Sequence, residues 1–310
     1  MEFKHVSVLL NECIEGLAVK PDGIYVDGTL GGAGHAFHVC EKLSEKGQFI
    51  GIDQDEAAIR TSTERLQPFG DRVHLVRSNY VNVKQVVKEL QIDKVDGILL
   101  DLGVSSYQLD TKERGFSYMA DAPLDMRMSQ QGETAADLVN TESREELARI
   151  LRDYGEEPYA WQIAGKIVEA RETAPILTTL QLADIVASAM PPAERRKNKN
   201  PSRRTFQALR IAVNHELDAL EEGLDTIFDH LAPGGRLCVI TFHSLEDRLV
   251  KNKFRRWSTA CTCPPEFPVC VCGGKAKAKL ITRKPIEADT QELEENRRSR
   301  SAHLRVLEKC

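Results

Sequence analysis

Four short apolar segments alternate with helix-like stretches over the first hundred residues. The apolar segments are residues 24–26, 49–52, 73–76 and 95–100, and the stretches 55–66 and 81–90 carry apolar residues at helical spacing. Short strands that alternate with helices predict a parallel sheet built from right-handed crossovers. Because Gly97-Ile98-Leu99-Leu100 is apolar throughout, we expect both faces of that sheet to be covered.

The alternation then stops. The next convincing strand begins at Arg236, which leaves a gap of 133 residues after Leu102, far longer than a single crossover needs. An amphipathic helix from Val213 to Leu231, ended by Ala232-Pro233-Gly234-Gly235, fills the last part of the gap. The remainder has its own helix starts with the pattern of capping boxes, Ser143 with Glu146 and Thr178 with Gln181. We therefore predict an all-helical domain, residues 106–209, inserted into an α/β domain made of residues 1–105 and 210–310.

Two further segments with alternating apolar residues, 280–283 and 302–307, follow the strand at 236–242. Both are typical of strands, and we expect them to close the sheet as an antiparallel pair. The predicted fold class is thus α/β: a mostly parallel, Rossmann-like sheet with a terminal antiparallel strand, plus the inserted helical domain.

Charge is distributed unevenly along the chain. The total is −5, but residues 194–210 hold seven basic side chains and one acid, and residues 251–284 hold nine and one. Such segments can bind a polyanion locally, although solvated loops have the same composition. No apolar run approaches the 18 residues of a membrane span, and the first residues lack the apolar core of a signal peptide. We therefore expect a cytoplasmic protein without a membrane partner.

Four of the eight cysteines lie within twelve residues, as Cys261, Cys263, Cys270 and Cys272. Without a secretion signal, such a cluster indicates metal or redox chemistry before a disulfide scaffold. Four thiolates can hold a zinc ion, but one residue within each pair is fewer than ordinary structural sites have. A structural zinc site and reduced, redox-labile thiols in a basic loop both stay open.

The first predicted strand leads directly into a glycine-rich loop, Asp27-Gly28-Thr29-Leu30-Gly31-Gly32-Ala33-Gly34-His35. Glycines let a backbone approach a ligand closely. A dinucleotide site needs G-x-G-x-x-G, whereas the nearest frame here ends in Phe37, and no Lys-Ser or Lys-Thr follows to make a P-loop. The loop therefore favours a nucleoside ligand without a pyrophosphate, namely S-adenosylmethionine.

Three predicted strands end in an acid, at Asp27, Asp53 and Asp101. Ligands of open α/β sheets lie at the carboxyl ends of the strands, and Asp53 has a separation from Asp27 close to that of a ribose-binding carboxylate. Asp53 could instead only form a turn at the strand end. Three acids on one rim suit a cationic sulfonium better than a phosphate.

Nine peptides, in order along nearly the whole chain, resemble those of the MraW family of ribosomal small-subunit RNA methyltransferases. They are residues 5–9, 27–35, 101–106, 114–117, 123–128, 154–157, 205–211, 242–248 and 299–302. The resemblance implies a class I methyltransferase domain interrupted by a helical substrate-recognition domain. It also implies S-adenosylmethionine as cofactor and methylation of cytosine N4 in the decoding region of 16S rRNA, as free RNA or in the small subunit.

The same resemblance implies cofactor contacts at Ala33, Gly34, His35, Asp53, Tyr80, Asp101 and Gln108. Many members of the family have Phe where this chain has Tyr80, and either ring offers a π face for stacking on adenine. The sequence does not fix the oligomeric state, and a homodimer is one option.

Asp101 is our candidate catalytic residue. Cytosine N4 is a poor nucleophile because its lone pair is delocalised into the ring, so an acceptor aimed at the amino hydrogens should raise its reactivity. Leu102-Gly103-Val104 follows Asp101 in place of the Pro-Pro-aromatic that often follows such an acid, which leaves a purely cofactor-binding role open. Ser105, Ser106 and His243 are further candidates. Methylation at C5 would need a cysteine nucleophile, and none occurs between Val95 and Arg114.

A basic cluster near the end of the predicted insertion is our candidate RNA contact. It consists of Arg195, Arg196, Lys197, Lys199, Arg203 and Arg204, which could hold the phosphates on either side of an exposed target base. Two rival functions stay open. The insertion and the basic segments weigh against a small-molecule methyltransferase, and the intact glycine loop and Asp53 weigh against a non-catalytic RNA-binding assembly factor.

Overall fold

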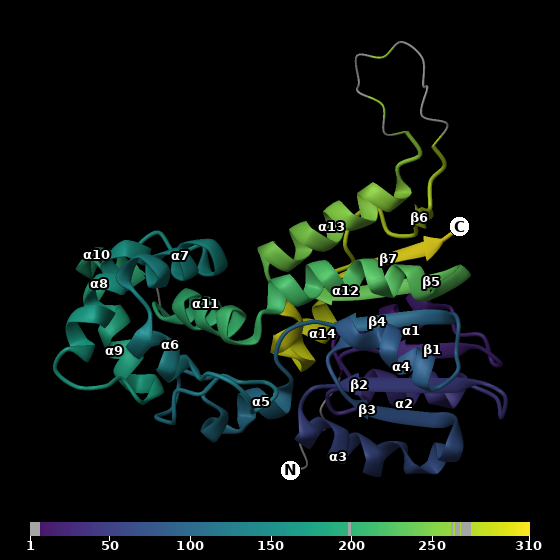
Figure 1. The fold of residues 1–310 in the computed structure, drawn as a ribbon, viewed down its shortest axis with the longest axis horizontal. Helices are drawn as coiled ribbons and strands as arrows, with labels where there is room; N and C mark the ends of the chain where they lie inside the picture. Colours follow the sequence, from purple (N-terminus) through teal and green to yellow (C-terminus); the bar gives the residue numbers. More distant parts are fainter. Residues whose placement is uncertain (1–6, 198–199, 262, 264–266, 268–273) are drawn as a thin grey trace. The chain divides into compact units, whose positions relative to one another are not determined.

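The structure is a computed structural model that describes residues 7–197, 200–261, 263, 267 and 274–310. The chain divides into two compact units, one formed by residues 1–103 and 218–310 and the other by residues 104–217 (Figure 1). Within the described ranges, none of the helices is both long and apolar enough to cross a membrane.

In the described part of the first unit, seven strands form one sheet in the order β3-β2-β1-β4-β5-β7-β6 (Figure 1). Strands β1 to β5 are parallel to one another, whereas β7 runs antiparallel to both β5 and β6. The predicted, mostly parallel sheet with a terminal antiparallel pair is therefore confirmed, although the strand predicted at residues 280–283 lies earlier, at Ala278–Leu280. The strands are β1 (Ile24–Asp27), β2 (Gln48–Asp53), β3 (Val73–Arg77), β4 (Val95–Asp101), β5 (Leu231–Thr241), β6 (Ala278–Leu280) and β7 (His303–Lys309).

Helices cover both faces of this sheet, because its central strands are apolar on both sides. In β4, Ile98 and Leu100 pack into the core on one face and Leu99 into the core on the other. The first face is covered by α4 (Val83–Glu89), α12 (Glu216–His230) and α13 (Ser244–Ser258). The second face is covered by α1 (Leu10–Leu17), α2 (Gly34–Lys42) and α3 (Glu56–Leu66). The short helix α14 (Thr290–Glu295) is tied to the start of α1, since Glu292 accepts the Leu9 N–H at 2.8 Å.

The strand register brings the three terminal acids to one edge of the sheet. Asp27 is aligned with Gly51 of β2 and with Leu99 of β4. Asp53 and Asp101 therefore each lie two residues further along the strands that flank β1. Neighbouring strands are about 4.8 Å apart, so these carboxyl groups share one small region.

The second unit is helical and has its own apolar core. Thr178 and Gln181 form the predicted capping box at the start of α9. Ser143 caps α7 by accepting the Glu146 N–H, but the Glu146 carboxylate binds Arg149 instead of completing the box. The helices are α5 (Ser106–Asp110), α6 (Ala135–Thr141), α7 (Arg144–Gly155), α8 (Ala160–Arg171), α9 (Thr179–Ala189), α10 (Pro192–Lys197) and α11 (Arg203–Asn214).

The prediction of one continuous amphipathic helix from Val213 to Leu231 is wrong at its start, because the chain breaks the helix at His215. Helix α11 ends at Asn214, and α12 begins at Glu216. The residue between them, His215, has a φ of 50° and donates its N–H to the carbonyl oxygen of Ala212. This left-handed cap ends one helix while the apolar spacing continues into the next, so the periodicity alone could not reveal the break.

Candidate active site

The glycine-rich loop crosses closely over the end of β4. Gly28 donates its N–H to Leu99 O at 2.9 Å, and a Cβ atom at Gly28 would lie 2.6 Å from the side chain of Leu100. Only glycine fits at that distance. Gly31 and Ala33 both have positive φ, of 51° and 56°, and Ala33 is the N-cap of α2. This turn leaves the backbone at the start of α2 beside the strand ends, where a ligand of the sheet binds.

Asp53 holds the glycine loop in place. Its Oδ2 accepts the Gly31 N–H and its Oδ1 accepts the Asp55 N–H, both at 2.8 Å. The carbonyl oxygen of Gly31 in turn accepts the hydroxyl of the buried Ser62 at 3.0 Å. The predicted turn role of Asp53 is thus present in the structure, and it orients the carboxylate at the same time.

The three rim carboxyls have raised pKa values because they are buried close to one another. Burial raises the pKa of Asp27 to about 7 and that of Asp53 to about 6. The pKa of Asp101 is raised to about 8, by burial first and then by the negative charges of Asp27 and Glu246. Asp101 Oδ1 is buried without a hydrogen-bond partner, although 27% of the side chain stays exposed. A cation placed here would lower the cost of ionising all three groups.

His35 does not supply that positive charge. Burial lowers the pKa of His35 to about 4, so its ring is neutral near pH 7. Its Nε2 is 2.9 Å from the carbonyl oxygen of Val8 and therefore carries the proton. The other nitrogen, Nδ1, lies 3.9 Å from Asp101 Oδ2. The rim is thus acidic, and among the residues that the structure describes Asp101 has no ion-pair contact besides the neutral His35.

The aromatic ring of Tyr80 lies close to a glycine of α12. Tyr80 begins a short 3-10 turn after β3, capped by Asn79. A Cβ atom at Gly223 would lie 2.8 Å from Tyr80 Cε2 and 2.9 Å from Cδ2, and one at Gly28 would lie 2.9 Å from Tyr80 Cβ. The ring is therefore confined between the glycine loop and α12.

Three other candidates have structural partners. His243 is the N-cap of α13, where its ring accepts the Glu246 N–H at 3.5 Å and its Nε2 lies 3.0 Å from Glu246 Oε1. Ser105 caps α5, and Gln108 closes that capping box by accepting the Ser105 N–H at 2.9 Å. Ser105 and the buried Gln108 belong to the second unit.

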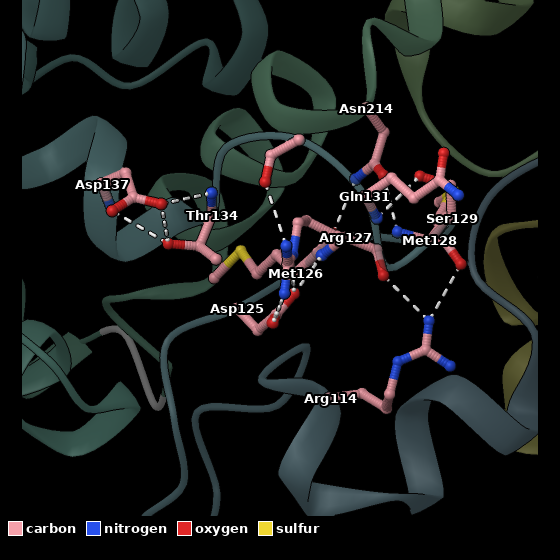
Figure 2. A network of polar contacts seen from close by, with 11 residues as sticks. Arg114, Asp125, Met126, Arg127, Met128, Ser129, Gln131, Thr134, Asp137 and Asn214 are labelled. Atoms are coloured by element: carbon pink, nitrogen blue, oxygen red, sulfur yellow. Dashed lines mark hydrogen bonds and ion pairs between the residues drawn. The ribbon is translucent and has the colours of Figure 1, made fainter.

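Two of the peptides that carry the family resemblance are joined in the second unit (Figure 2). Arg114 donates to the carbonyl oxygens of Arg127 and Met128, at 2.8 and 3.0 Å. From α11, Asn214 accepts the Met128 N–H and donates to Met126 O, both at 2.8 Å. Gly115 has a φ of 71°, and a Cβ atom there would lie 2.3 Å from Pro123 O. These contacts fix the backbone of residues 123–128.

The candidate RNA residues lie on the second unit. Arg195 and Arg196 are exposed on α10, and Arg203 and Arg204 are exposed in the first turn of α11. Lys199 lies outside the described residues, as do Cys270 and Cys272 of the cysteine cluster. The other two cysteines form no disulfide with a described residue; Cys261 is exposed and Cys263 is half-buried.

Three residues that shape the site were not among the candidates predicted from the sequence. Thr29 accepts the Asp101 N–H through its hydroxyl at 2.6 Å and so connects the ends of β1 and β4. Glu246 raises the pKa of Asp101 from the start of α13. Gly223 bounds the space of the Tyr80 ring. Thr29 lies inside the glycine loop and could have been singled out there, whereas the other two depend on contacts between distant segments.

A sheet of this order, with β7 antiparallel and an acid-lined glycine loop after β1, defines a class I methyltransferase, whose cofactor is S-adenosylmethionine. The residues present fit that cofactor. The acidic rim suits its positive sulfur, and the orphaned Oδ1 of Asp101 is an acceptor still without a partner.

The model of the MraW methylase family matches residues 2–310, and the chain belongs to that family. The chain is 59% identical to ribosomal RNA small subunit methyltransferase H 2 of Agathobacter rectalis, over 100% of this chain and 99% of that protein. It is 55% identical to ribosomal RNA small subunit methyltransferase H of Symbiobacterium thermophilum, over 100% and 98%. A crystal structure of an rRNA methylase from Streptococcus thermophilus is far more distant, with 12% identity, 98% of each chain covered and a TM-score of 0.45.

Proposed function

We propose that this chain transfers a methyl group from S-adenosylmethionine to N4 of a cytosine in the decoding region of 16S rRNA, in the cytoplasm. The observation that supports it most is the rim of three buried carboxyls with raised pKa values. The small-subunit rRNA named for the relatives supports the substrate class.

The bound cofactor supplies an electrophilic methyl group on a positively charged sulfur. We expect Asp27 and Asp101 to stabilise that charge and Asp53 to accept hydrogen bonds from the ribose hydroxyls. Tyr80 is proposed to stack on the adenine, and the backbone of Ala33, Gly34 and His35 to line the rest of the crevice. Gln108 would contribute from the second unit.

Asp101 is proposed to act on the amine as well. An ionised Asp101 would accept a hydrogen bond from the N4 amino group, which orients the nitrogen and increases its nucleophilic character. As the N–C bond forms, the nitrogen must lose a proton, and the carboxylate is placed to receive it. The buried Oδ1 without a partner supports this role, because an acceptor already satisfied by the protein could not serve.

The second unit is proposed to recognise the RNA. Arg203 and Arg204 stand in the first turn of α11, where the helix dipole disfavours positive charge, and the Ser202 side chain makes no capping hydrogen bond. Two arginines at that position have no benefit for the helix itself, although Arg204 favours the ionised form of the buried Glu157. Both are exposed and well placed to hold phosphate groups.

Labelled methyl transfer tests the proposal. The purified protein should methylate small ribosomal subunits or rRNA that lack the modification, and it should leave tRNA and free cytidine unmodified. Nuclease digestion and mass spectrometry should place the label on cytosine N4. Label on C5, label on free cytidine at a similar rate, or no binding of S-adenosylmethionine in calorimetry would each refute the proposal.

A further inference from the structure

The second basic segment of the sequence, residues 251–284, has no part in the site described above. Its described portion belongs to the first unit and comes from the C-terminal half of α13 and from the chain around β6. Eight of its nine cations are exposed, and within the part of the chain that the structure describes none of these eight takes part in an ion pair. Six of the eight lie on α13 or around β6 and are called here the α13–β6 basic surface: Lys251, Arg255, Arg256, Lys275, Lys277 and Lys279.

On α13, Lys251 and Arg255 lie on the flank away from Asp225 of α12. Val250, Phe254 and Trp257 are buried in the core beneath the helix. On one flank, Lys253 pairs with Asp225 of α12 at 2.6 Å and is thereby neutralised. Lys251 and Arg255 are four residues apart, so they lie together on the opposite flank.

The lysines around β6 adjoin the C-terminal end of α13 (Figure 1). The Lys277 N–H donates to Trp257 O at 2.8 Å, which places Lys277 next to Arg255 and Arg256. Lys279 lies opposite Glu308 in the β6–β7 register. That carboxylate is already engaged by Arg236 at 3.0 Å. Positive charge therefore accumulates here without local compensation, in a chain whose net charge is −5.

Local stability explains only part of this surface. Arg255 and Arg256 are favourable near the C-terminus of a helix, and Lys279 on the edge strand opposes pairing with another sheet. Lys251 has a local partner as well, because it helps to lower the pKa of Asp247 one turn earlier on α13. Lys275 and Lys277 have neither function. A polyanionic partner accounts for all six.

We propose that the α13–β6 basic surface binds the phosphate backbone of the rRNA at a distance in sequence from the target cytosine. The inference rests on the proposed rRNA substrate and adds a second contact, on the methyltransferase unit itself. The surface would contribute to affinity for the large substrate and not to methyl transfer, since none of its residues belongs to the donor crevice.

The test is a triple substitution, Lys251→Gln, Lys275→Gln and Lys277→Gln, which leaves the end of α13 intact. If each lysine contacts one phosphate, the slope of log affinity against log salt should become shallower by about 2 to 3. Between 50 and 200 mM salt, wild type should then lose about 20- to 40-fold more affinity for rRNA than the variant does. KM for the subunit should rise, while kcat and the affinity for S-adenosylmethionine should stay unchanged.

A matched control, Lys42→Gln with Lys84→Gln and Lys88→Gln, removes the same charge from exposed positions of α2 and α4. It should retain the wild-type slope. An equal effect of the two triple variants would overturn the proposal, because only net charge would then matter. Loss of binding to vesicles rich in anionic lipid, with rRNA binding intact, would overturn it in favour of a membrane surface. Failure of the wild-type protein to methylate rRNA is a different result and refutes the proposed function instead.

Discussion

Replacing Gly223 with Ala should weaken binding of S-adenosylmethionine through Tyr80. The added methyl would lie 2.8 and 2.9 Å from two carbons of the Tyr80 ring, whereas carbon atoms in contact are about 3.5–4.0 Å apart. The ring must therefore withdraw by about 0.7–1 Å. Overpacking of this kind costs about 1–3 kcal/mol, and the better helix propensity of Ala offsets about 1 kcal/mol of that. The protein should stay folded.

The donor site should be affected more than stability. A base stacked on an aromatic ring gains about 1–3 kcal/mol. Displacing the ring should remove roughly half of that, about 0.5–1.5 kcal/mol, which corresponds to an affinity weaker by about 2- to 13-fold in calorimetry. Glu222→Ala, an exposed substitution on the same helix, serves as the control and should bind the donor like wild type.

A double-mutant cycle decides whether the ring transmits the effect. Once Tyr80→Ala has removed the ring, the methyl at position 223 meets no obstacle from it. Gly223→Ala should then leave donor affinity within about twofold of the Tyr80→Ala variant, and its only trace should be the gain of about 1 kcal/mol in helix propensity. If Gly223→Ala weakened binding equally in both backgrounds, the reasoning from the Tyr80 contact would be refuted.

Three other predictions concern the rim and the basic helix start. Asp101→Asn should lower the rate of methyl transfer by about 10²–10⁴-fold and weaken donor binding much less, in single-turnover and calorimetric assays; equal losses in both would leave Asp101 only a binding role. Donor affinity should rise from pH 6 to 8.5, because the cation favours ionised Asp101, whose pKa in the free protein is about 8; this rise should be smaller in Asp101→Asn. The pKa of Asp101 in the folded protein exceeds its usual value, so ionisation of Asp101 should make the free protein less stable as pH rises from about 4 to 8. Thermal melts of wild type and Asp101→Asn should therefore converge at low pH. Charge reversal of Arg203 and Arg204 to Glu should reduce rRNA methylation and the salt slope by about 1 per residue; unchanged methylation would remove these residues from the RNA contact.

The sheet could be predicted from the sequence because its signal is local. The run at residues 97–100 is apolar on both faces, and three of the four runs in the first hundred residues are followed directly by an acid. The strand ends then follow from the general rule for parallel sheets, which brings Asp27, Asp53 and Asp101 to one edge. Crossovers between parallel strands are short. The gap of 133 residues after Leu102 could therefore be recognised as an insertion before any helix inside it was located.

The rest of the site depends on contacts that no local pattern records. Gly223 meets Tyr80 across 143 positions of the chain, and Glu246 acts on Asp101 from a different element. The break at His215 interrupts an apolar period that continues on both sides. Glu146 has the spacing of a capping box, yet a neighbouring Arg149 offers it a charged partner, and the ion pair prevails. Contacts between distant segments place Gly223 and Glu246 in the site. A left-handed residue ends the helix at His215, and a competing ion pair prevents the capping box at Glu146.

The electrostatics of the rim also bear on which state of the cofactor it favours. Three carboxyls whose pKa values are raised, by burial first and then by neighbouring negative charges, form an arrangement that is unfavourable when it is ionised and alone. A positively charged sulfur relieves this repulsion, whereas the neutral thioether left after methyl transfer does not. The rim should therefore bind the donor more tightly than the product, and the preference should grow as pH rises and the carboxyls ionise. A site built only from glycine backbone would show no such dependence, so the acids account both for selecting the cation and for releasing the neutral product.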